Sequence, residues 1–231
     1  MWPGPTTVPR FARVTFLVAA ILCAQRAQCN DAPSVTLALQ FDHRFSVASL
    51  KEMKREFERI MLPAKVRIEW RMTDDLTGGE SFQEVVVARF KGNCEAGQTG
   101  AAGAALPHLG MTHVISGDVS PFAELECNSI RALLARNAAP ETTFQLQRML
   151  GLAMARVLAH ELYHAVLGTP RHGAHGIAKA SLTPSDLFGG PIGFEPDQIE
   201  RIEEALTSAA DSHSRSTVTL SLLPVKVRGT W

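Results

Sequence analysis

A long helix-compatible stretch between clear start and stop signals constrains the fold of this 231-residue chain more than any other feature. Thr142 and Gln145 have the spacing of a capping box, in which each side chain bonds to the other residue's backbone N–H at a helix start. From there to Gly168, only Gly151 is unfavourable in a helix, and a helix tolerates one glycine at a cost of about 1 kcal/mol. Gly168 suits the left-handed position that ends many helices. The pattern predicts one helix over residues 143–167 that is apolar on most faces and therefore buried.

The last two turns of this predicted helix carry the motif H-E-x-x-H as His160, Glu161 and His164. Two histidines four residues apart project from the same side of a helix, one turn apart, so both imidazoles can reach one Zn²⁺ ion. Glu161 is rotated by about 100° from His160, which brings it to the open position of the metal without making it a ligand. The motif predicts a zinc-dependent hydrolase in which Glu161 is the general base that activates water.

A catalytic zinc site normally has three protein ligands and one open position, so a third ligand must lie outside the motif. His172 is the leading candidate, because the turn at Gly168 can fold the chain back under the metal. His175 is a second candidate, and a downstream carboxylate, Glu195 or Glu200, is a third. The choice among them stays open on the sequence.

Two family resemblances run through this segment. Residues 160–172 read H-E-L-Y-H-A-V-L-G-T-P-R-H and resemble the metzincin signature H-E-x-x-H-x-x-G-x-x-H, with intervals of four residues instead of three on both sides of Gly168. No Met follows His172, whereas metzincins carry a Met in a turn beneath the zinc. The segment is also similar to an uncharacterised group of predicted secreted bacterial zincins with the motifs H-E-L-Y-H, T-x-x-H and G-x-A-K. These motifs correspond here to residues 160–164, 169–172 and 176–179.

The resemblance implies an α+β, zincin-like fold: a twisted mixed β-sheet packed on a backing helix and a long active-site helix, with a small C-terminal helical subdomain. It also implies a secreted zinc metallopeptidase in which His160, His164 and His172 bind the ion and Glu161 is catalytic. It names no substrate beyond a peptide or protein.

Alternating apolar residues predict strands over residues 35–41, 65–71, 84–90 and 111–116. The last of these could be an edge strand that pairs with an extended peptide. Helices are expected from a capping box at Ser49 to Pro63, from Ser120-Pro121 through Leu134, and over residues 196–209. Residues 92–107, rich in Gly and Ala, are expected to be a mobile surface loop.

The N-terminus is typical of a secretory signal peptide, because Arg10 and Arg13 precede an apolar run that is too short to span a bilayer. We expect a signal peptide over residues 1–29, one catalytic domain over residues 30–210 and a loosely ordered tail over residues 211–231. The mature protein would then be secreted or periplasmic, without stable membrane insertion. Lys+Arg and Asp+Glu balance at 23 each, so no excess charge favours nucleic acid, and we expect a monomer.

Removal of the signal peptide would leave two cysteines, Cys94 and Cys127. An even pair in an oxidising compartment predicts one disulfide, and two buried free thiols are the alternative.

Several other residues are ambiguous. Tyr163 could reach an oxyanion but is more typical of a packing residue, and Arg156 could support a ligand or be exposed. Lys179 could pair with a carboxylate or be solvated, while His113 could border the cleft and His108 is not expected to bind metal. Three other functions also stay open: a non-catalytic zinc protein, a binding module on a zincin scaffold, and a zinc amidase acting on cell-wall amides.

Overall fold

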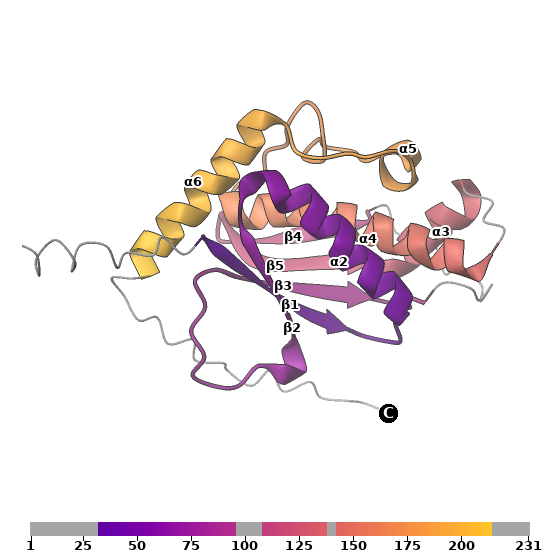
Figure 1. The fold of residues 1–231 in the computed structure, drawn as a ribbon, viewed down its shortest axis with the longest axis horizontal. Coiled ribbons are helices and arrows are strands. Elements are labelled where there is room, and N and C mark those ends of the chain that lie inside the picture. Colours follow the sequence, from indigo (N-terminus) through magenta and orange to yellow (C-terminus); the bar gives the residue numbers. More distant parts are fainter. Residues whose placement is uncertain (1–31, 96–107, 138–141, 214–231) are drawn as a thin grey trace, which may run out of the picture. The chain divides into compact units, whose positions relative to one another are not determined.

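The computed structural model describes residues 32–95, 108–137 and 142–213. In this part of the chain, five strands form one mixed sheet in the order β2-β1-β3-β5-β4 (Figure 1). The first four strands in this order are parallel to one another, and β4 is antiparallel to β5 at one edge. The strands are β1 (Ser34–Phe41), β2 (Arg67–Met72), β3 (Val85–Lys91), β4 (Gly110–Ile115) and β5 (Asp118–Glu126).

Five helices accompany the sheet in the same part of the chain, and the longest of them confirms the helix predicted from the sequence. It begins at the capping box of Thr142 and Gln145 and ends at Gly168, whose φ of 57° is left-handed. None of the helices in these described ranges has both the length and the apolar character needed to cross a membrane. The helices are α2 (Val47–Met61), α3 (Cys127–Asn137), α4 (Thr143–Leu167), α5 (Pro184–Phe188) and α6 (Pro196–His213).

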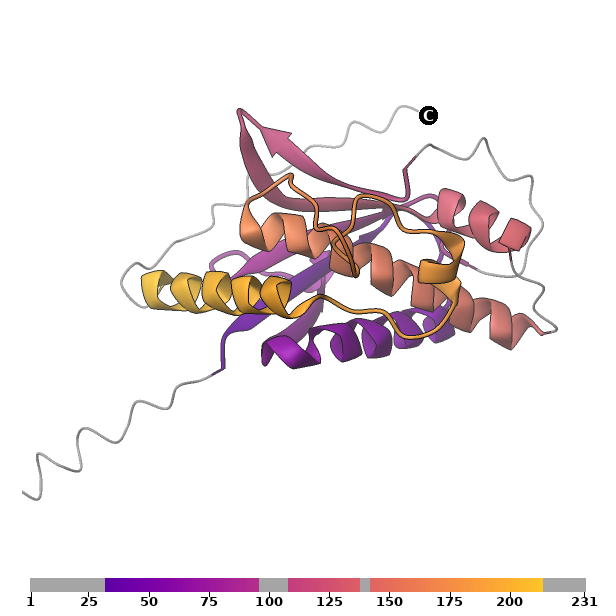
Figure 2. The same ribbon diagram turned by 90° about the horizontal axis from the view of Figure 1, so that it is seen from above.

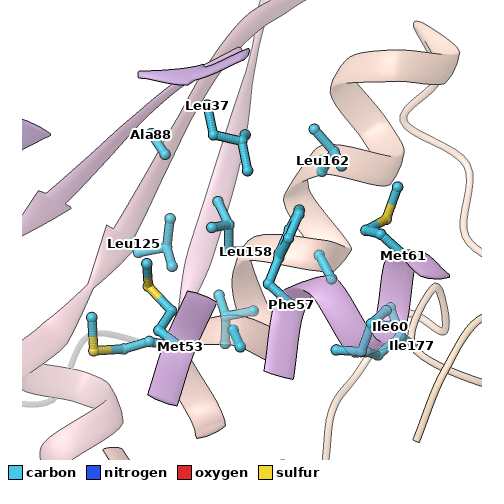
Figure 3. Close-up of a cluster of buried hydrophobic side chains, with 14 of the residues drawn as sticks. Leu37, Met53, Phe57, Ile60, Met61, Ala88, Leu125, Leu158, Leu162 and Ile177 are labelled. Atoms are coloured by element: carbon cyan, nitrogen blue, oxygen red, sulfur yellow. The ribbon is translucent and has the colours of Figure 1, made fainter. Parts of the chain in front are cut away.

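Helices α2 and α4 lie side by side on one face of the sheet (Figures 1 and 2). The strands present apolar residues to this face at every second position, and the register pairs Leu37 with Val86 and Phe90 with Leu125. All four side chains are fully buried. Figure 3 shows Leu37, Ala88 and Leu125 from the sheet facing side chains from both helices. Burial of each leucine contributes about 1.5–3 kcal/mol. The core therefore fixes α4 against the sheet, and with it the H-E-x-x-H motif.

Gly151 lies where α4 crosses α2. A Cβ at this position would overlap the backbone oxygen of Ser49 and lie 2.8 Å from the Cβ of Glu52. The glycine that weakens the helix locally is thus required for the close approach of the two helices.

The helix predicted from Ser120-Pro121 is wrong in its first half. Residues 118–126 form strand β5, and α3 begins only at Cys127. Ser116 and Gly117 both have positive φ, 55° and 96°, and they connect β4 to β5 as a two-residue hairpin turn. Pro121 is tolerated because the β4–β5 register shifts between Thr112 and Val114, and proline is accepted at such bulges.

The start of α2 also differs from the prediction. The N-cap is Ser46, whose hydroxyl accepts a hydrogen bond from the backbone N–H of Ser49, so the helix begins one turn before the predicted capping box. Ser49 is a fully buried residue inside the helix. The residue three positions after Ser46 is Ser49, not Glu or Gln, so the actual start of the helix lacks the capping-box motif.

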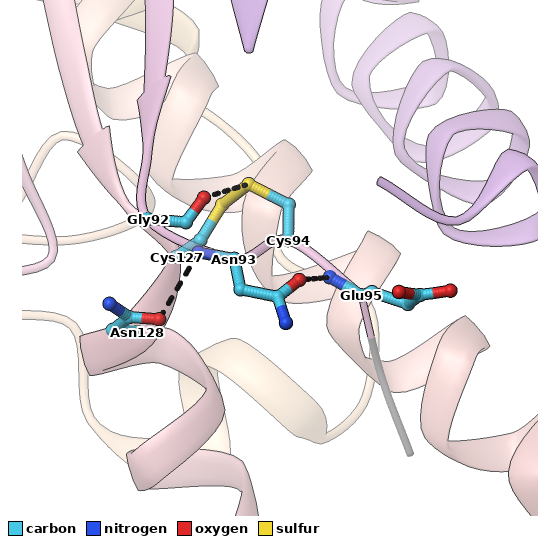
Figure 4. Close-up of a disulfide and its surroundings, with 6 residues drawn as sticks. All are labelled: Gly92, Asn93, Cys94, Glu95, Cys127 and Asn128. Atoms are coloured by element: carbon cyan, nitrogen blue, oxygen red, sulfur yellow. Dashed lines mark hydrogen bonds between the residues drawn. A yellow bond between two sulfur atoms is a disulfide. The ribbon is translucent and has the colours of Figure 1, made fainter. Parts of the chain in front are cut away.

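Cys94 and Cys127 form the predicted disulfide, which ties the segment after β3 to the first residue of α3 (Figure 4). The Asn93 backbone N–H donates to Asn128 Oδ1 over 3.2 Å beside it.

The C-terminal helices α5 and α6 pack into the same hydrophobic core as α2 and α4, to which they contribute Leu187, Ile202 and Leu206. The predicted signal peptide, most of the predicted loop and most of the predicted tail lie outside the described residues.

Candidate metal centre

Three histidines converge at the C-terminal end of α4. His160 and His164 project from the helix, and His172 lies in the segment that follows the turn at Gly168. One nitrogen from each imidazole lies within 4.8 Å of the other two, and in the described ranges no other His, Cys, Asp or Glu joins this group. The ring centroids are 4.7–5.2 Å apart. His160 and His164 are 9% and 6% exposed, and His172 is exposed, so the cluster is open on the side of His172.

Backbone carbonyls orient both helical imidazoles. His160 Nδ1 lies 2.8 Å from the oxygen of Ile177, and His164 Nδ1 lies 2.7 Å from the oxygen of Thr169. A carbonyl only accepts, so each Nδ1 carries the proton and each neutral ring keeps its lone pair on Nε2. Such a bond from the far ring nitrogen is the usual support of a metal-binding histidine.

The two Nε2 atoms face one another at 3.1 Å. With both Nδ1 atoms protonated, a hydrogen bond between them would require one ring to be an imidazolium. Burial opposes this state: it lowers the pKa of His160 to about 4 and also lowers the pKa of His164. At neutral pH two lone pairs therefore point at one another, an arrangement that a cation between them would stabilise. Imidazole nitrogens at this spacing suit Zn²⁺.

Glu161 lies beside the histidines but outside their cluster. Its carboxylate is 5% exposed, and Oε2 accepts a hydrogen bond of 2.7 Å from the Thr112 hydroxyl of β4. Burial raises the pKa of Glu161 to about 7, although the hydrogen bonds from Thr112 act to lower it. A carboxyl group whose pKa is near neutral pH can both take up and release a proton, as a general base requires.

An open cleft of about 290 Å³ adjoins the histidines and Glu161. Met111, Thr112 and Val114 of β4 form one wall, and Thr169 and Pro170 contribute to another. A second hollow of about 260 Å³ shares Gly110, Glu161 and His160 with the first. Among the described strands, β4 pairs with β5 alone and lies at the edge of the sheet, and four of its residues line the cleft.

Two arginines that pair with buried Glu56 also donate to the backbone of the segment that supplies the Ile177 carbonyl, and they hold it against the helices. Arg156, 2% exposed, donates to Glu56 Oε1 over 3.0 Å and to the backbone oxygen of Asp186 over 2.6 Å. Arg59 donates to Glu56 as well and to the backbone oxygen of Ile192. Of the two alternatives predicted for Arg156, exposure is wrong, because the side chain is 2% exposed. Arg156 makes no direct hydrogen bond to a histidine of the cluster, and its carboxylate partner lies 100 residues away in α2.

The remaining ambiguous residues have clear surroundings. Tyr163 is buried, stacks on Phe194 and accepts a hydrogen bond of 3.0 Å from Arg201, which fits a packing role. Lys179 pairs with Asp186 at 2.6 Å.

The other histidines and the carboxylates considered as ligands also have clear positions. His113 lies on the sheet face away from the cleft, next to Phe122 and Glu124. His108 lines the second hollow. The other candidate third ligands, His175, Glu195 and Glu200, lie outside the histidine group.

Two contributors to the site had no signal in the sequence. Thr112 reaches Glu161 from a strand 49 residues earlier, and the Ile177 carbonyl acts through the backbone alone. Neither contact follows from a motif, because both depend on how distant segments pack.

Comparison with known proteins adds a distant structural likeness. No family model and no curated protein match the sequence. Among solved structures, the fold is similar to that of archaemetzincin from Methanopyrus kandleri, with 13% sequence identity and a TM-score of 0.44. The likeness covers 76% of this chain and 96% of the archaemetzincin chain. At this distance it does not assign a function, which has to come from the geometry of the site.

Proposed function

We propose that the protein is a secreted, zincin-like zinc metallopeptidase. The observation that carries the proposal is the pair of buried imidazoles whose Nε2 lone pairs face each other at 3.1 Å while both Nδ1 atoms are bonded to carbonyls. His160 and His164 would bind the ion together with His172, whose ring closes the cluster.

Zinc bound by three histidines lowers the pKa of a coordinated water to about 7 and polarises a carbonyl oxygen. Glu161 lies next to this group with a raised pKa and takes the proton from the attacking water. It then delivers that proton to the leaving amine. Burial helps the first step, because a desolvated carboxylate at a pKa of about 7 is a stronger base than an exposed one. The carboxylic acid that forms can still release its proton near neutral pH, because its pKa lies there.

The absence of a fourth ligand among the described residues favours catalysis over a purely structural zinc site. A structural zinc normally has four protein ligands, whereas a catalytic one keeps a position open for water or substrate. The group here has three histidines, and its exposed member, His172, faces the cleft.

A peptide substrate fits the wall of this cleft. No described strand pairs with the outer edge of β4, whose residues line the cleft beside Glu161, and an extended chain could pair with this edge. Export is supported by the Cys94–Cys127 disulfide, since disulfides persist in oxidising compartments.

Hydrolysis by the Glu161→Gln variant tests the proposal. We expect the zinc-loaded wild type to cleave a fluorescently labelled unfolded protein such as casein, and Glu161→Gln to lose at least about 1,000-fold in rate while it keeps one zinc. His175→Ala, outside the cluster, is the matched control and should retain activity. Full activity of Glu161→Gln would contradict the assignment. Cleavage of peptidoglycan amides but not casein would instead indicate an amidase.

A further inference from the structure

Strand β4 holds the carboxylate of Glu161, which projects from helix α4. Thr112 Oγ1 lies 2.7 Å from Glu161 Oε2 and 3.1 Å from the backbone oxygen of the same residue. These two contacts connect residues 49 positions apart in the sequence. Thr112 therefore fixes the carboxylate relative to the sheet and to the helix at the same time.

Gly110, two residues earlier on the same face of β4, leaves the space that the other carboxylate oxygen occupies. A Cβ at Gly110 would lie 2.7 Å from Glu161 Oε1 and 2.7 Å from Val157 Cγ1, closer than real Cβ contacts allow. Any larger residue would push the carboxylate out of this position. β4 thus determines the positions of both carboxylate oxygens of Glu161. The Thr112 hydroxyl donates to one of them, and the lack of a side chain at Gly110 leaves space for the other.

The Thr112 hydroxyl has a suitable acceptor for either protonation state of Glu161. When the carboxylate is ionised, the hydroxyl donates to Oε2. When the carboxyl carries a proton, the hydroxyl hydrogen can turn to the backbone oxygen of Glu161, and Oγ1 can then accept from the carboxyl group. A valine in this place would have the same shape but neither option.

We propose that Thr112 is a positioning residue for the general base Glu161. Thr112 holds the carboxyl group toward the cleft both when it takes up the proton and when it releases it, and Gly110 provides the space for the carboxyl group. This inference rests on the proposed function, since it assigns Glu161 the role of base. Thr112 itself does not contact the reacting atoms.

Kinetics of Thr112→Val and Thr112→Ser test the role. Loss of a hydrogen bond to a charged group is worth about 10–100-fold, so we expect kcat of Thr112→Val to fall by that factor. KM should stay within about twofold and zinc content unchanged, because the hydroxyl contacts neither substrate nor ion. Thr112→Ser keeps the hydroxyl and should restore kcat to within about threefold. Gly110→Ala should also lower kcat, and it carries the same test if Thr112→Val does not fold.

A second readout requires neither metal nor activity. In the metal-free protein, a double-mutant cycle of Thr112→Val and Glu161→Ala in denaturant unfolding measures whether the two side chains interact. We expect Thr112→Val to change the unfolding equilibrium constant about five- to tenfold more when Glu161 is present than when it is alanine.

The outcomes separate this inference from the proposed function. Wild-type kcat in Thr112→Val together with an inactive Glu161→Gln would overturn the role of Thr112 and leave the peptidase assignment standing. Additive effects of Thr112→Val and Glu161→Ala on the unfolding equilibrium would also overturn the role of Thr112. Wild-type activity in both variants, or no hydrolysis by the zinc-loaded wild type, would overturn the proposed function and this inference together.

Discussion

Helix α4 carries two groups of buried polar side chains one turn apart, and they differ in how completely the protein satisfies them. Arg156 directs its donors to Glu56 and to the backbone oxygen of Asp186, so protein atoms surround the guanidinium. His160 and His164 have protein partners on Nδ1, but among the described residues each Nε2 has no hydrogen-bonding neighbour other than the Nε2 of the other ring. Burial lowers the pKa of Arg156 and of both histidines, so desolvation alone does not distinguish the two groups.

The difference separates a structural polar cluster from a candidate metal site. Burial acts to raise the pKa of Glu56, but hydrogen bonds from Arg59 and Arg156 outweigh it and leave the pKa lowered. The cluster is therefore charged and complete without a ligand. Burial lowers the pKa of His160 and of His164, which favours the neutral form in which imidazoles bind metal.

The largest effect is expected on stability, from a change in the cluster of Glu56, Arg59 and Arg156. Arg156→Ala should lower the free energy of unfolding by roughly 3–5 kcal/mol, because buried Glu56 loses one of its two arginine partners and the backbone oxygen of Asp186 loses the guanidinium donor. Arg148→Ala is the control on the same helix: its side chain is 53% exposed, and its pairing with Glu52 should contribute less than about 1 kcal/mol. Chemical denaturation of the metal-free proteins measures both. Equal effects of the two changes would show that the buried pair is not a structural requirement.

A change in the cluster of His160, His164 and His172 should lower the affinity for zinc. A structural zinc is typically bound with about 10–16 kcal/mol shared over four ligands, so His164→Ala should weaken zinc binding by roughly 3–4 kcal/mol, a few hundredfold. His175→Ala should leave the affinity unchanged, because His175 lies outside the histidine group. Competition with a fluorescent zinc chelator gives both constants. An unchanged affinity in His164→Ala would remove this histidine from the site.

The pH dependence of the metal-free protein tests the electrostatics of the same site. The pKa of Glu161 is raised to about 7 in the folded state from 4.5, so its contribution to stability is present below pH 4.5 and is lost as pH rises through 7. The pKa of His160 is lowered to about 4 from 6.5, so its contribution is present above pH 6.5 and is lost as pH falls through 4.

Glu161→Gln removes only the first of these contributions. Relative to this variant, the wild type should lose roughly 3 kcal/mol of stability between pH 4.5 and pH 7. Urea unfolding at several pH values measures the difference. A difference that does not change with pH would show that the carboxyl is not desolvated as the structure has it.

The smallest effect is expected at Tyr163, which lies next to His164 but points into the packing. Tyr163→Phe removes the hydrogen bond from Arg201 and should cost about 1 kcal/mol of stability, with kcat unchanged. Thermal unfolding and peptide hydrolysis together check this. A large loss of kcat at unchanged stability would instead give the Tyr163 hydroxyl a part in the reaction.

The sequence predicted the parts of the site that depend on local signals. Caps at Thr142 and Gly168 bound α4, and the spacing of His160 and His164 follows from the helix period. Strand β5 was mistaken for helix because Ser-Pro is also a helix-start signal, and the hairpin turn at Ser116 and Gly117 was missed. Thr112 and the Glu56–Arg156 pair could not be predicted, since they join residues 49 and 100 positions apart through tertiary packing.

We propose that His160, His164 and His172 hold one zinc ion and leave one of its positions open. A crystal structure of the zinc-loaded protein, with the metal located by anomalous scattering, would show the ligands themselves. We expect one zinc about 2.0–2.1 Å from a nitrogen of each of His160, His164 and His172, with a water near Glu161 as the remaining ligand. A zinc bound by four side chains, or by His160 and His164 without His172, would contradict this account of the site.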